Sequence, residues 1–350
     1  MENQQLEPTP KRPLRKIFLL IGLLTIGVSG FFGWNFFLKP NVPSKLDNKY
    51  LLLPSGASLD QVVDSLKAGN FIQNEGSFRV MADRMSYQGR AGRYEITPGM
   101  SSYQLVSHLR AGKQSPVKVV LVNERLPEHI AAKVAKSIEP DSQALVTLLN
   151  DTTYLDSIGF TPQTLLSLFI PNTYEVFWNL TPRRFVERMK KEHDRFWAAE
   201  GREAKAAALG LTREEVYTVA SIVERETNDE AEKPRMAGVY LNRVEQDWPL
   251  QADPTLVFAS RDWEARDLAK YKDLDSPYNT YKYPGLPPGP ISMASIPSLD
   301  AVLNREKHNY MFFVAMGDGS GKHMFAESYD AHKVNIEIYK RNLIGRGLGL

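Results

Sequence analysis

Two glutamates separated by a single residue, Glu224 and Glu226, end a stretch of sequence that is typical of a helix. The spacing predicts a helix over residues 211–227, which begins with Thr212 and Glu215 in the arrangement of a capping box. Apolar residues then recur at helical spacing, at Val216, Val219, Ala220 and Val223. One face of this helix is therefore expected to pack into a core, with the two glutamates at its carboxyl end.

Helical geometry places the two glutamates in different surroundings. The residues three, four and seven positions before Glu226 are all apolar (Val223, Ile222, Val219), whereas Ser221, Ala220 and Tyr217 hold those positions before Glu224. A carboxyl on the drier face, at the negative end of the helix dipole, favours its neutral form. A glutamic acid that stays protonated near neutral pH can act as general acid on a glycosidic oxygen. The alternative, which helix statistics alone favour, is that both glutamates are solvated and have no role.

The composition excludes several other chemistries. The chain of 350 residues has no cysteine, which rules out disulfides, thiolate nucleophiles and metal sites with Cys ligands. Its 43 Lys and Arg against 41 Asp and Glu give a net charge of +2, so nucleic acid is not an expected partner. The six histidines lack metal-motif spacing, and residues 317–322 fit a hairpin turn between residues 310–315 and 323–325 better than a phosphate loop. We therefore predict neither a metal nor another cofactor, which leaves carboxylate acid–base chemistry.

An apolar segment near the amino terminus predicts a membrane anchor. Residues 17–34 carry no charge, and the apolar stretch continues to residue 38. Because Lys11, Arg12, Arg15 and Lys16 precede it, we expect a cytoplasmic tail (1–16), a transmembrane helix (17–38) and an extracytoplasmic linker (39–47). A cleaved signal peptide is the alternative, but the apolar run exceeds a typical signal core and no small-residue cleavage site precedes its bulky end.

An internal repeat marks a small domain after the linker. Residues 56–70 match residues 99–113, and each copy has the residues of a short capped helix. The N-caps are Ser58 and Ser101, the capping-box partners are Gln61 and Gln104, and the helix stops are Gly69 and Gly112. Strand-like runs flank the two helices at residues 50–53, 92–96 and 117–122. We predict a small α+β module over residues 48–122.

The remainder of the chain, residues 123–345, reads as a second and larger domain. Its pattern is helical from about residue 127 to residue 197, with a polar break at residues 140–142 and a loop at residues 169–177. The last third is rich in Pro, Gly and Tyr, as in residues 276–281 and 285–291, and cannot be regular helix. Long ordered loops of this kind usually line a site. The predicted fold class is α+β.

Six ordered motifs of the chain resemble those of the endolytic murein transglycosylase family, also called MltG or YceG-like, which are bacterial cell-wall lyases. The motifs are Ala220-Ser-Ile-Val-Glu-Arg-Glu-Thr227, Tyr240-Leu-Asn-Arg243, Leu250-Gln-Ala-Asp-Pro-Thr255, Tyr278-Asn-Thr-Tyr281, Gly285-Leu-Pro-Pro-Gly-Pro-Ile291 and Tyr310-Met-Phe-Phe-Val314. The resemblance implies an anchor, a LysM-like glycan-binding module and a mixed α/β lytic transglycosylase domain. These match residues 17–38, 48–122 and 123–345.

The resemblance also implies site residues. The glutamate followed by Thr in the Glu-x-Glu-Thr motif corresponds to Glu226, so the family motif and the helix face point to the same catalytic residue, with Glu224 as second choice. Polar residues of the later motifs could hold sugar hydroxyls and N-acetyl groups or could fix the loops. They are Gln251, Asp253, Thr255, Asn279 and Tyr281.

The implied reaction is nonhydrolytic cleavage of the MurNAc–GlcNAc β-1,4 bond within peptidoglycan glycan strands, leaving 1,6-anhydro ends and limiting the length of nascent strands. The implied setting is the cell membrane, which is the inner membrane in a Gram-negative cell, with cell-wall synthases as possible partners. Two alternatives stay open. One is an anchored peptidoglycan-binding or assembly protein without catalysis, and the other is a hydrolase, which would use the same acid residue.

Overall fold

The computed structural model describes residues 14–265 and 267–348, which divide into two compact units. The first unit runs to Pro116 and includes Phe177–Asn179, and the second comprises Val117–Val176 and the chain from Leu180 onward. Most of the expected cytoplasmic tail, residues 1–13, lies outside the described residues. The boundary at Pro116 falls before the one expected at residue 122, because the strand that begins at Val117 pairs within the second unit.

The first unit contains the two repeated helices. Its elements after the linker are β1 (Tyr50–Leu53), α2 (Leu59–Ala68), α3 (Glu75–Arg84), β2 (Gly92–Glu95) and α4 (Ser102–Ala111). Strands β1 and β2 pair antiparallel, with Tyr50 opposite Glu95. The two predicted capping boxes, Ser58–Gln61 and Ser101–Gln104, are both present and confirm the helix starts. The helices bury Val62, Leu66, Leu105 and Leu109 against Phe78 of α3, so the repeat builds one small core.

The linker is attached to this core by a buried asparagine. The side chain of Asn41 donates to Asn74 O and Ser102 Oγ, both at 2.9 Å, and its Oδ1 accepts the backbone N–H groups of Gln73 and Asn74. Val42, the next residue, is buried in the same core. The ordered module therefore begins at about residue 41 rather than at residue 48.

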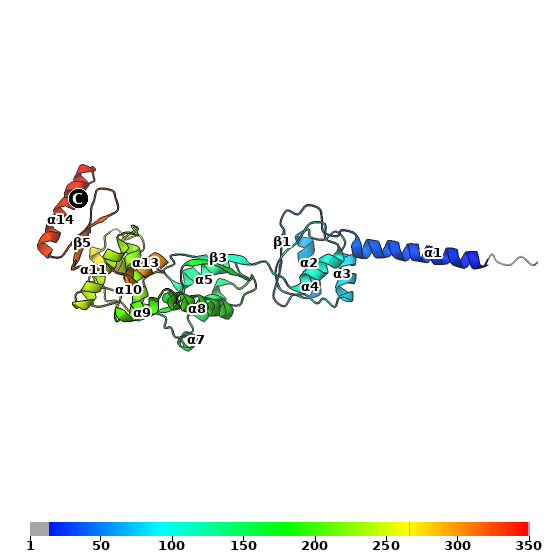
Figure 1. The fold of residues 1–350 in the computed structure, drawn as a ribbon, viewed down its shortest axis with the longest axis horizontal. Helices are drawn as coiled ribbons and strands as arrows, with labels where there is room; N and C mark the ends of the chain where they lie inside the picture. The colour runs from blue at the N-terminus through cyan, green and yellow to red at the C-terminus, as the bar shows by residue number, and fades with distance from the viewer. Residues whose placement is uncertain (1–13, 266, 349–350) are drawn as a thin grey trace, which may run out of the picture. The chain divides into compact units, whose positions relative to one another are not determined.

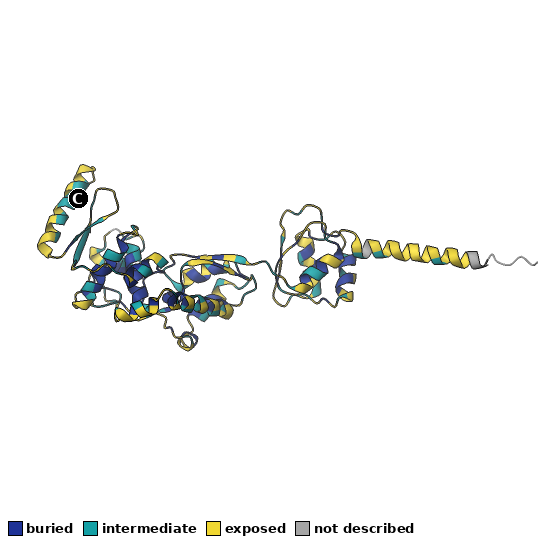
Figure 2. Cartoon of the chain, in the orientation of Figure 1, coloured by how far each residue is buried: buried dark blue, intermediate teal, exposed yellow. Residues whose placement is uncertain are grey.

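The amino-terminal helix, α1 (Leu14–Gly33), continues into a π-helical turn, η1 (Trp34–Leu38). Its apolar side chains are exposed, as the yellow ribbon in Figure 2 shows, and Phe18 and Ile26 are 69% and 72% exposed. Over the part of the chain that the structure describes, no helix has both the length and the apolarity needed to cross a membrane. The span expected over residues 17–38 thus stays a prediction.

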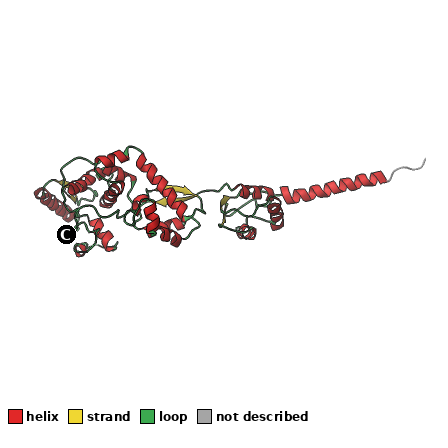
Figure 3. Ribbon diagram, turned by 90° about the horizontal axis from the view of Figure 1, so that it is seen from below, coloured by secondary structure: helices red, strands yellow, loops and turns green. Residues whose placement is uncertain are grey.

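One half of the second unit is built around a two-stranded sheet. Strands β3 (Val117–Leu121) and β4 (Asn172–Val176) pair antiparallel, with Val119 opposite Tyr174, and lie among helices (Figure 3). The helices are α5 (Pro127–Ala135), α6 (Ser142–Leu149), α7 (Thr152–Ser157), the 3₁₀ turn η2 (Leu165–Leu168) and α8 (Pro182–Ala198). The prediction of a loop at residues 169–177 was wrong, because this segment contains β4. Tyr174 and Val176 alternate into the core there, a period-two pattern that the surrounding Pro, Asn and Thr obscured.

The other half packs around α10 (Arg213–Glu226), which Figure 1 places among α9 (Arg202–Ala208), α11 (Lys233–Glu245) and α13 (Ile296–Leu303). The predicted Thr212–Glu215 capping box is present, and the helix ends at Glu226 as expected. Every residue from Val216 to Val223 is buried, which holds the last turn of α10 firmly in the fold. Shorter elements complete this half, namely α12 (Asp253–Ser260) and the 3₁₀ turn η3 (Ala269–Tyr271).

The glycine-rich run near the carboxyl end forms a hairpin turn, which confirms that prediction. Strands β5 (Phe312–Ala315) and β6 (His323–Ala326) pair antiparallel on either side of it. Gly317, Gly319 and Gly321 all have positive φ, at 71°, 92° and 74°, which only glycine adopts without strain. The last helix, α14 (Tyr329–Gly345), follows the hairpin and packs against it.

Candidate active site

The last turn of α10 points three consecutive charged side chains in three directions. Successive residues of an α-helix are separated by about 100°, so Glu224, Arg225 and Glu226 cannot share a face. Glu224 turns towards α13, Arg225 towards Ser292, and Glu226 towards Tyr240 of α11. Each of the three therefore has its own surroundings and its own chemistry.

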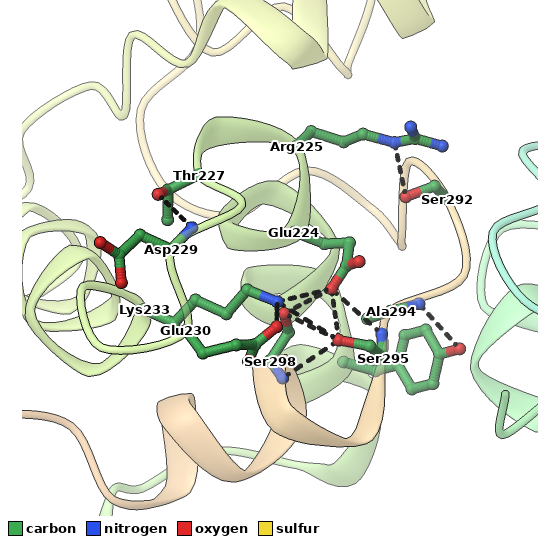
Figure 4. A network of polar contacts seen from close by, with 11 residues as sticks. Glu224, Arg225, Thr227, Asp229, Glu230, Lys233, Ser292, Ala294, Ser295 and Ser298 are labelled. Carbon is green, nitrogen blue, oxygen red and sulfur yellow. Dashed lines mark hydrogen bonds and ion pairs between the residues drawn. The ribbon is translucent and has the colours of Figure 1, made fainter. Parts of the chain in front are cut away.

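Glu224 is fixed in a polar network, shown in Figure 4. Its Oε2 accepts hydrogen bonds from the hydroxyls of Ser295, at 2.5 Å, and Ser298, and it faces Lys233 Nζ at 3.3 Å. Burial opposes ionisation of this carboxyl, but the two hydroxyls and the ammonium charge together hold the pKa of Glu224 below its usual value. Glu224 is thus an ionised anchor for the start of α13 rather than a proton donor.

Glu226 has the opposite character. It is half-buried, and its Oε1 accepts one hydrogen bond of 2.6 Å from the hydroxyl of Tyr240, which is itself fully buried. Burial raises the pKa of Glu226 to about 7, and the negative charge of Asp253 adds to this, whereas the Tyr240 hydroxyl and the charge of Arg243 lower it. A carboxyl with this pKa is part protonated at neutral pH and can both give and take a proton.

Glu226 lies in the wall of a cleft of about 290 Å³ within the second unit. The residues that line the cleft are of two kinds, apolar ones (Pro254, Val257, Phe258, Trp263, Leu268 and Ile291) and charged ones (Glu226, Asp253, Arg125 and Arg225). A few charged groups that converge on an apolar and aromatic cavity are the usual composition of a ligand site. Among the described residues, no group of His, Asp and Glu side chains is placed to hold a metal ion.

Two of the expected binding residues, Asp253 and Tyr281, lie at or beside this cleft, and a third, Gln251, is exposed near Asp253 in the sequence. Asp253 lines it together with Glu226, and the hydroxyl of Tyr281 donates to Asp253 Oδ1 at 2.5 Å. Gln251 is exposed two residues before Asp253, with a φ of +48° that is unusual for a residue with a side chain. Asp253 was expected on a loop but lies in the first turn of α12, where a carboxylate suits the positive end of the helix dipole.

The other two expected binding residues are inside the protein. Thr255 is fully buried, and its hydroxyl bonds to Ala252 O and Thr280 Oγ1. Asn279 is also fully buried, donating to Lys272 O and Leu274 O and accepting the backbone N–H of Tyr281. Since all these groups are occupied, Thr255 and Asn279 shape the loops that carry Asp253 and Tyr281.

Sequence reasoning assigned no role to several residues of the site. Tyr240 and Arg243 stood in a family motif, and their spacing of three residues on one helix was a signal that both face the same neighbour. Arg243 is buried and donates to Met311 O and Leu250 O, which ties α11 to the segments before β5 and α12. Arg125 and Trp263 had no such signal. The guanidinium of Arg125 lies 4.7 Å from the Trp263 ring centre, a contact between positions far apart in the sequence.

A family profile, two relatives and one solved structure are similar to this chain. A sequence profile of the YceG-like family matches residues 51–338. The chain is 27% identical over 304 residues to the endolytic murein transglycosylase of Bacillus subtilis strain 168, covering 82% of this chain and 83% of that protein. It is 25% identical over 355 residues to the endolytic murein transglycosylase of Streptococcus pneumoniae serotype 2 strain D39, covering 91% of this chain and 64% of that protein.

A solved structure points to the same family. The crystal structure of a YceG-like protein from Listeria monocytogenes superposes with a TM-score of 0.57 at 26% identity, covering 81% of this chain and 97% of that one. The profile match spans most of the chain and includes α10, Tyr240 and the cleft. The chain therefore belongs to the YceG-like family.

Proposed function

We propose that this protein is an endolytic murein transglycosylase, a lyase that cleaves peptidoglycan strands at internal MurNAc–GlcNAc bonds. The observation that carries the proposal is the carboxyl of Glu226, held by Tyr240 in the wall of an apolar and aromatic cleft with a pKa raised to about 7. The names of the relatives in Bacillus and Streptococcus support it.

The chemistry needs one group that first gives and then takes a proton. Protonated Glu226 donates to the bridging oxygen of the β-1,4 bond as the bond to C1 breaks. The carboxylate so formed then removes the proton from the C6 hydroxyl of the same MurNAc, whose oxygen attacks C1 and closes the 1,6-anhydro ring. The proton returned to Glu226 resets the enzyme, and no water is consumed.

The neighbours of Glu226 suit this cycle. The positive charge that develops at C1 would be stabilised by a nearby negative charge, which Asp253 supplies from the same cleft. Tyr281, through its hydrogen bond, keeps Asp253 turned in one direction. The indole of Trp263, which is partly exposed in the cleft, offers an apolar surface for a sugar ring, and exposed Gln251 offers an amide to sugar hydroxyls.

The products decide between a lyase and a hydrolase. Glycosidases that add water also use two carboxyl groups in one cleft. Because Asp253 lies in the cleft with Glu226, the products must be identified. Purified full-length protein should convert uncrosslinked glycan strands into fragments with anhydro ends, lighter by one water molecule than hydrolysed fragments, as read by mass spectrometry. Reducing ends instead would identify a hydrolase, and intact strands would favour a binding protein without catalysis.

The pH dependence of the reaction should report Glu226 directly. Because the acid form is required, kcat/KM should fall as pH rises through about 7. Tyr240→Phe removes a hydrogen bond that favours the ionised form, so the pKa should rise and the fall should move to higher pH. Asp253→Asn removes a negative charge that disfavours the ionised form, so the fall should move to lower pH. Movement of both variants in the same direction would contradict the assignment.

The setting that we propose is the cell membrane, with residues 17–38 as anchor, the tail cytoplasmic and both units outside. The exposed apolar side chains of α1 support this, because such a surface is unfavourable in water. A reporter that works only in the cytoplasm should be active when fused at the amino terminus and inactive at the carboxyl terminus. Activity at both ends would refute this topology, and a mature protein that begins near residue 39 would refute the retained anchor.

We further propose that the first unit is a LysM-like module that binds glycan, and that the protein acts beside cell-wall synthases on nascent strands. Deleting residues 41–116 should reduce sedimentation of the protein with purified peptidoglycan, and unchanged sedimentation would make the module a spacer. Cross-linking in intact membranes should capture a synthase with the full-length protein, and its absence from the captured proteins would contradict the partnership.

A further inference from the structure

A second cavity, of about 510 Å³, adjoins the cleft of Glu226 and shares Arg125, Arg225 and Trp263 with it. We call it the basic cavity. The other residues that line it come from the segment after β3 and from α5, and they are Asn123, Glu124, His129, Ala132, Lys133 and Lys136. Arg225 extends out of the Glu224 network in Figure 4, to where Ser292 and the backbone carbonyl of Asn123 accept from it.

The basic cavity has positive charge that the protein does not neutralise. Among its described lining residues Glu124 is the sole acid, and that carboxylate is already occupied by Lys133 and by the backbone N–H groups of Val122 and Asn123. Within the described chain, Arg125 and Arg225 form no ion pair. Burial and the neighbouring charge of Arg125 both lower the pKa of Arg225. Two half-buried guanidiniums that repel each other are stabilised when an anion binds between them.

The sequence of α5 and the preceding loop explains why these charges meet. His129, Lys133 and Lys136 recur at spacings of four and three on and just after α5, so they share one face of that helix. The opposite face carries Ile130, Ala131 and Val134, which are buried in the core beside β3. Packing of the apolar face therefore turns the cationic face towards Arg225 at the end of α10.

We propose that the basic cavity binds carboxylates of the stem peptides carried by the glycan strand, so that the enzyme recognises strands through their peptides as well as their sugars. This inference rests on the proposed function. In an uncrosslinked strand the sugar rings are uncharged, and the carboxylates belong to the peptides attached to MurNAc. A guanidinium binds a carboxylate through two parallel hydrogen bonds. The basic cavity adjoins the cleft, so a peptide could reach it from a sugar bound beside Glu226.

The test compares two forms of one substrate. Uncrosslinked strands with free peptide carboxylates and the same strands with carboxylates converted to amides by carbodiimide and ammonia are digested by full-length protein. Loss of a charge-assisted hydrogen bond should make the wild-type KM about tenfold higher for the amidated strands. Arg125→Gln should bring the ratio of the two KM values close to one, and Lys136→Gln should lower it less. Lys191→Gln is the matched control, because Lys191 is exposed on α8 and lines neither cavity, and it should keep the wild-type ratio.

Equal KM values of the wild type for both strands would overturn the proposal, and so would an Arg125→Gln variant that keeps the wild-type ratio. Any phosphate at the strand ends is removed before amidation, because carbodiimide activates phosphates as well as carboxylates, so that the two forms differ only at the peptide carboxylates. Calorimetry separates this inference from the proposed function. Full-length Glu226→Gln protein should bind a disaccharide-peptide with free carboxylates about tenfold more tightly than its amidated form, whether or not the wild type makes anhydro ends. Equal affinities for the two forms would refute the proposed carboxylate site without bearing on the proposed function.

Discussion

Glu226→Gln should reduce turnover of uncrosslinked glycan strands by about 10²- to 10⁴-fold, the usual contribution of a general acid–base group. Glutamine keeps the size of the side chain and can still accept the Tyr240 hydrogen bond, but it has no carboxyl proton to donate and is not a comparable base. The measurement is the rate of formation of anhydro ends by the full-length variant, with circular dichroism to confirm that the protein is folded.

Glu214→Gln is the matched control for this change. It makes the same substitution in the first turn of the same helix, away from the cleft, and should leave turnover near that of the wild type. If Glu226→Gln keeps near-wild-type turnover, the catalytic assignment fails and Glu224 becomes the candidate. If the wild type cleaves strands and a folded Glu226→Gln variant binds them without cleaving them, the protein is not an assembly factor without catalysis.

The largest expected effect on stability comes from the other glutamate. Glu224→Gln should lower the free energy of unfolding by about 3 kcal/mol, because it removes the charge that compensates a buried ammonium and weakens two charge-assisted hydrogen bonds. Lys233 is only 4% exposed at its side chain, and its other carboxylate partner, Glu230, is 60% exposed. Thermal or urea unfolding of the second unit would measure the loss.

Glu230→Gln provides the comparison, because it breaks an ion pair of the same lysine at an exposed position and should cost less than about 1 kcal/mol. Turnover per folded molecule should persist in Glu224→Gln, since Glu224 faces Ser295 and Lys233 rather than the cleft. A Glu224→Gln variant that is as stable as the wild type but inactive would reverse the roles given to the two glutamates.

In the structure, Glu224 and Glu226 differ in chemistry for a reason other than the one that the sequence indicated. Helix periodicity correctly indicated that Glu226 follows an apolar face, and that pattern is local, because it depends only on residues within two turns of the same helix. The same periodicity suggested a wetter position for Glu224. Its hydroxyl partners, Ser295 and Ser298, lie about seventy residues further along the chain, at the start of α13, where the periodicity of α10 could not indicate them.

The sequence by itself determined those features that depend only on residues close together in the chain. The capping boxes at Ser58, Ser101 and Thr212 and the glycine turn between β5 and β6 are of this kind, because hydrogen bonds and φ angles within four residues decide them. The family motifs added the assignment of Glu226, which physical reasoning about one helix had left open.

What only the tertiary structure decided were the encounters between distant segments. Asp253 meets Glu226 in one cleft, Arg125 covers Trp263 beside it, and β4 finds its partner in β3, each across a long stretch of chain. Thr255 and Asn279 were expected to bind substrate because they are polar and stand in loop-like motifs. In the structure both side chains are buried and form hydrogen bonds with backbone or hydroxyl partners. Burial and long-range pairing depend on which elements pack together, and residue type and spacing do not specify that choice.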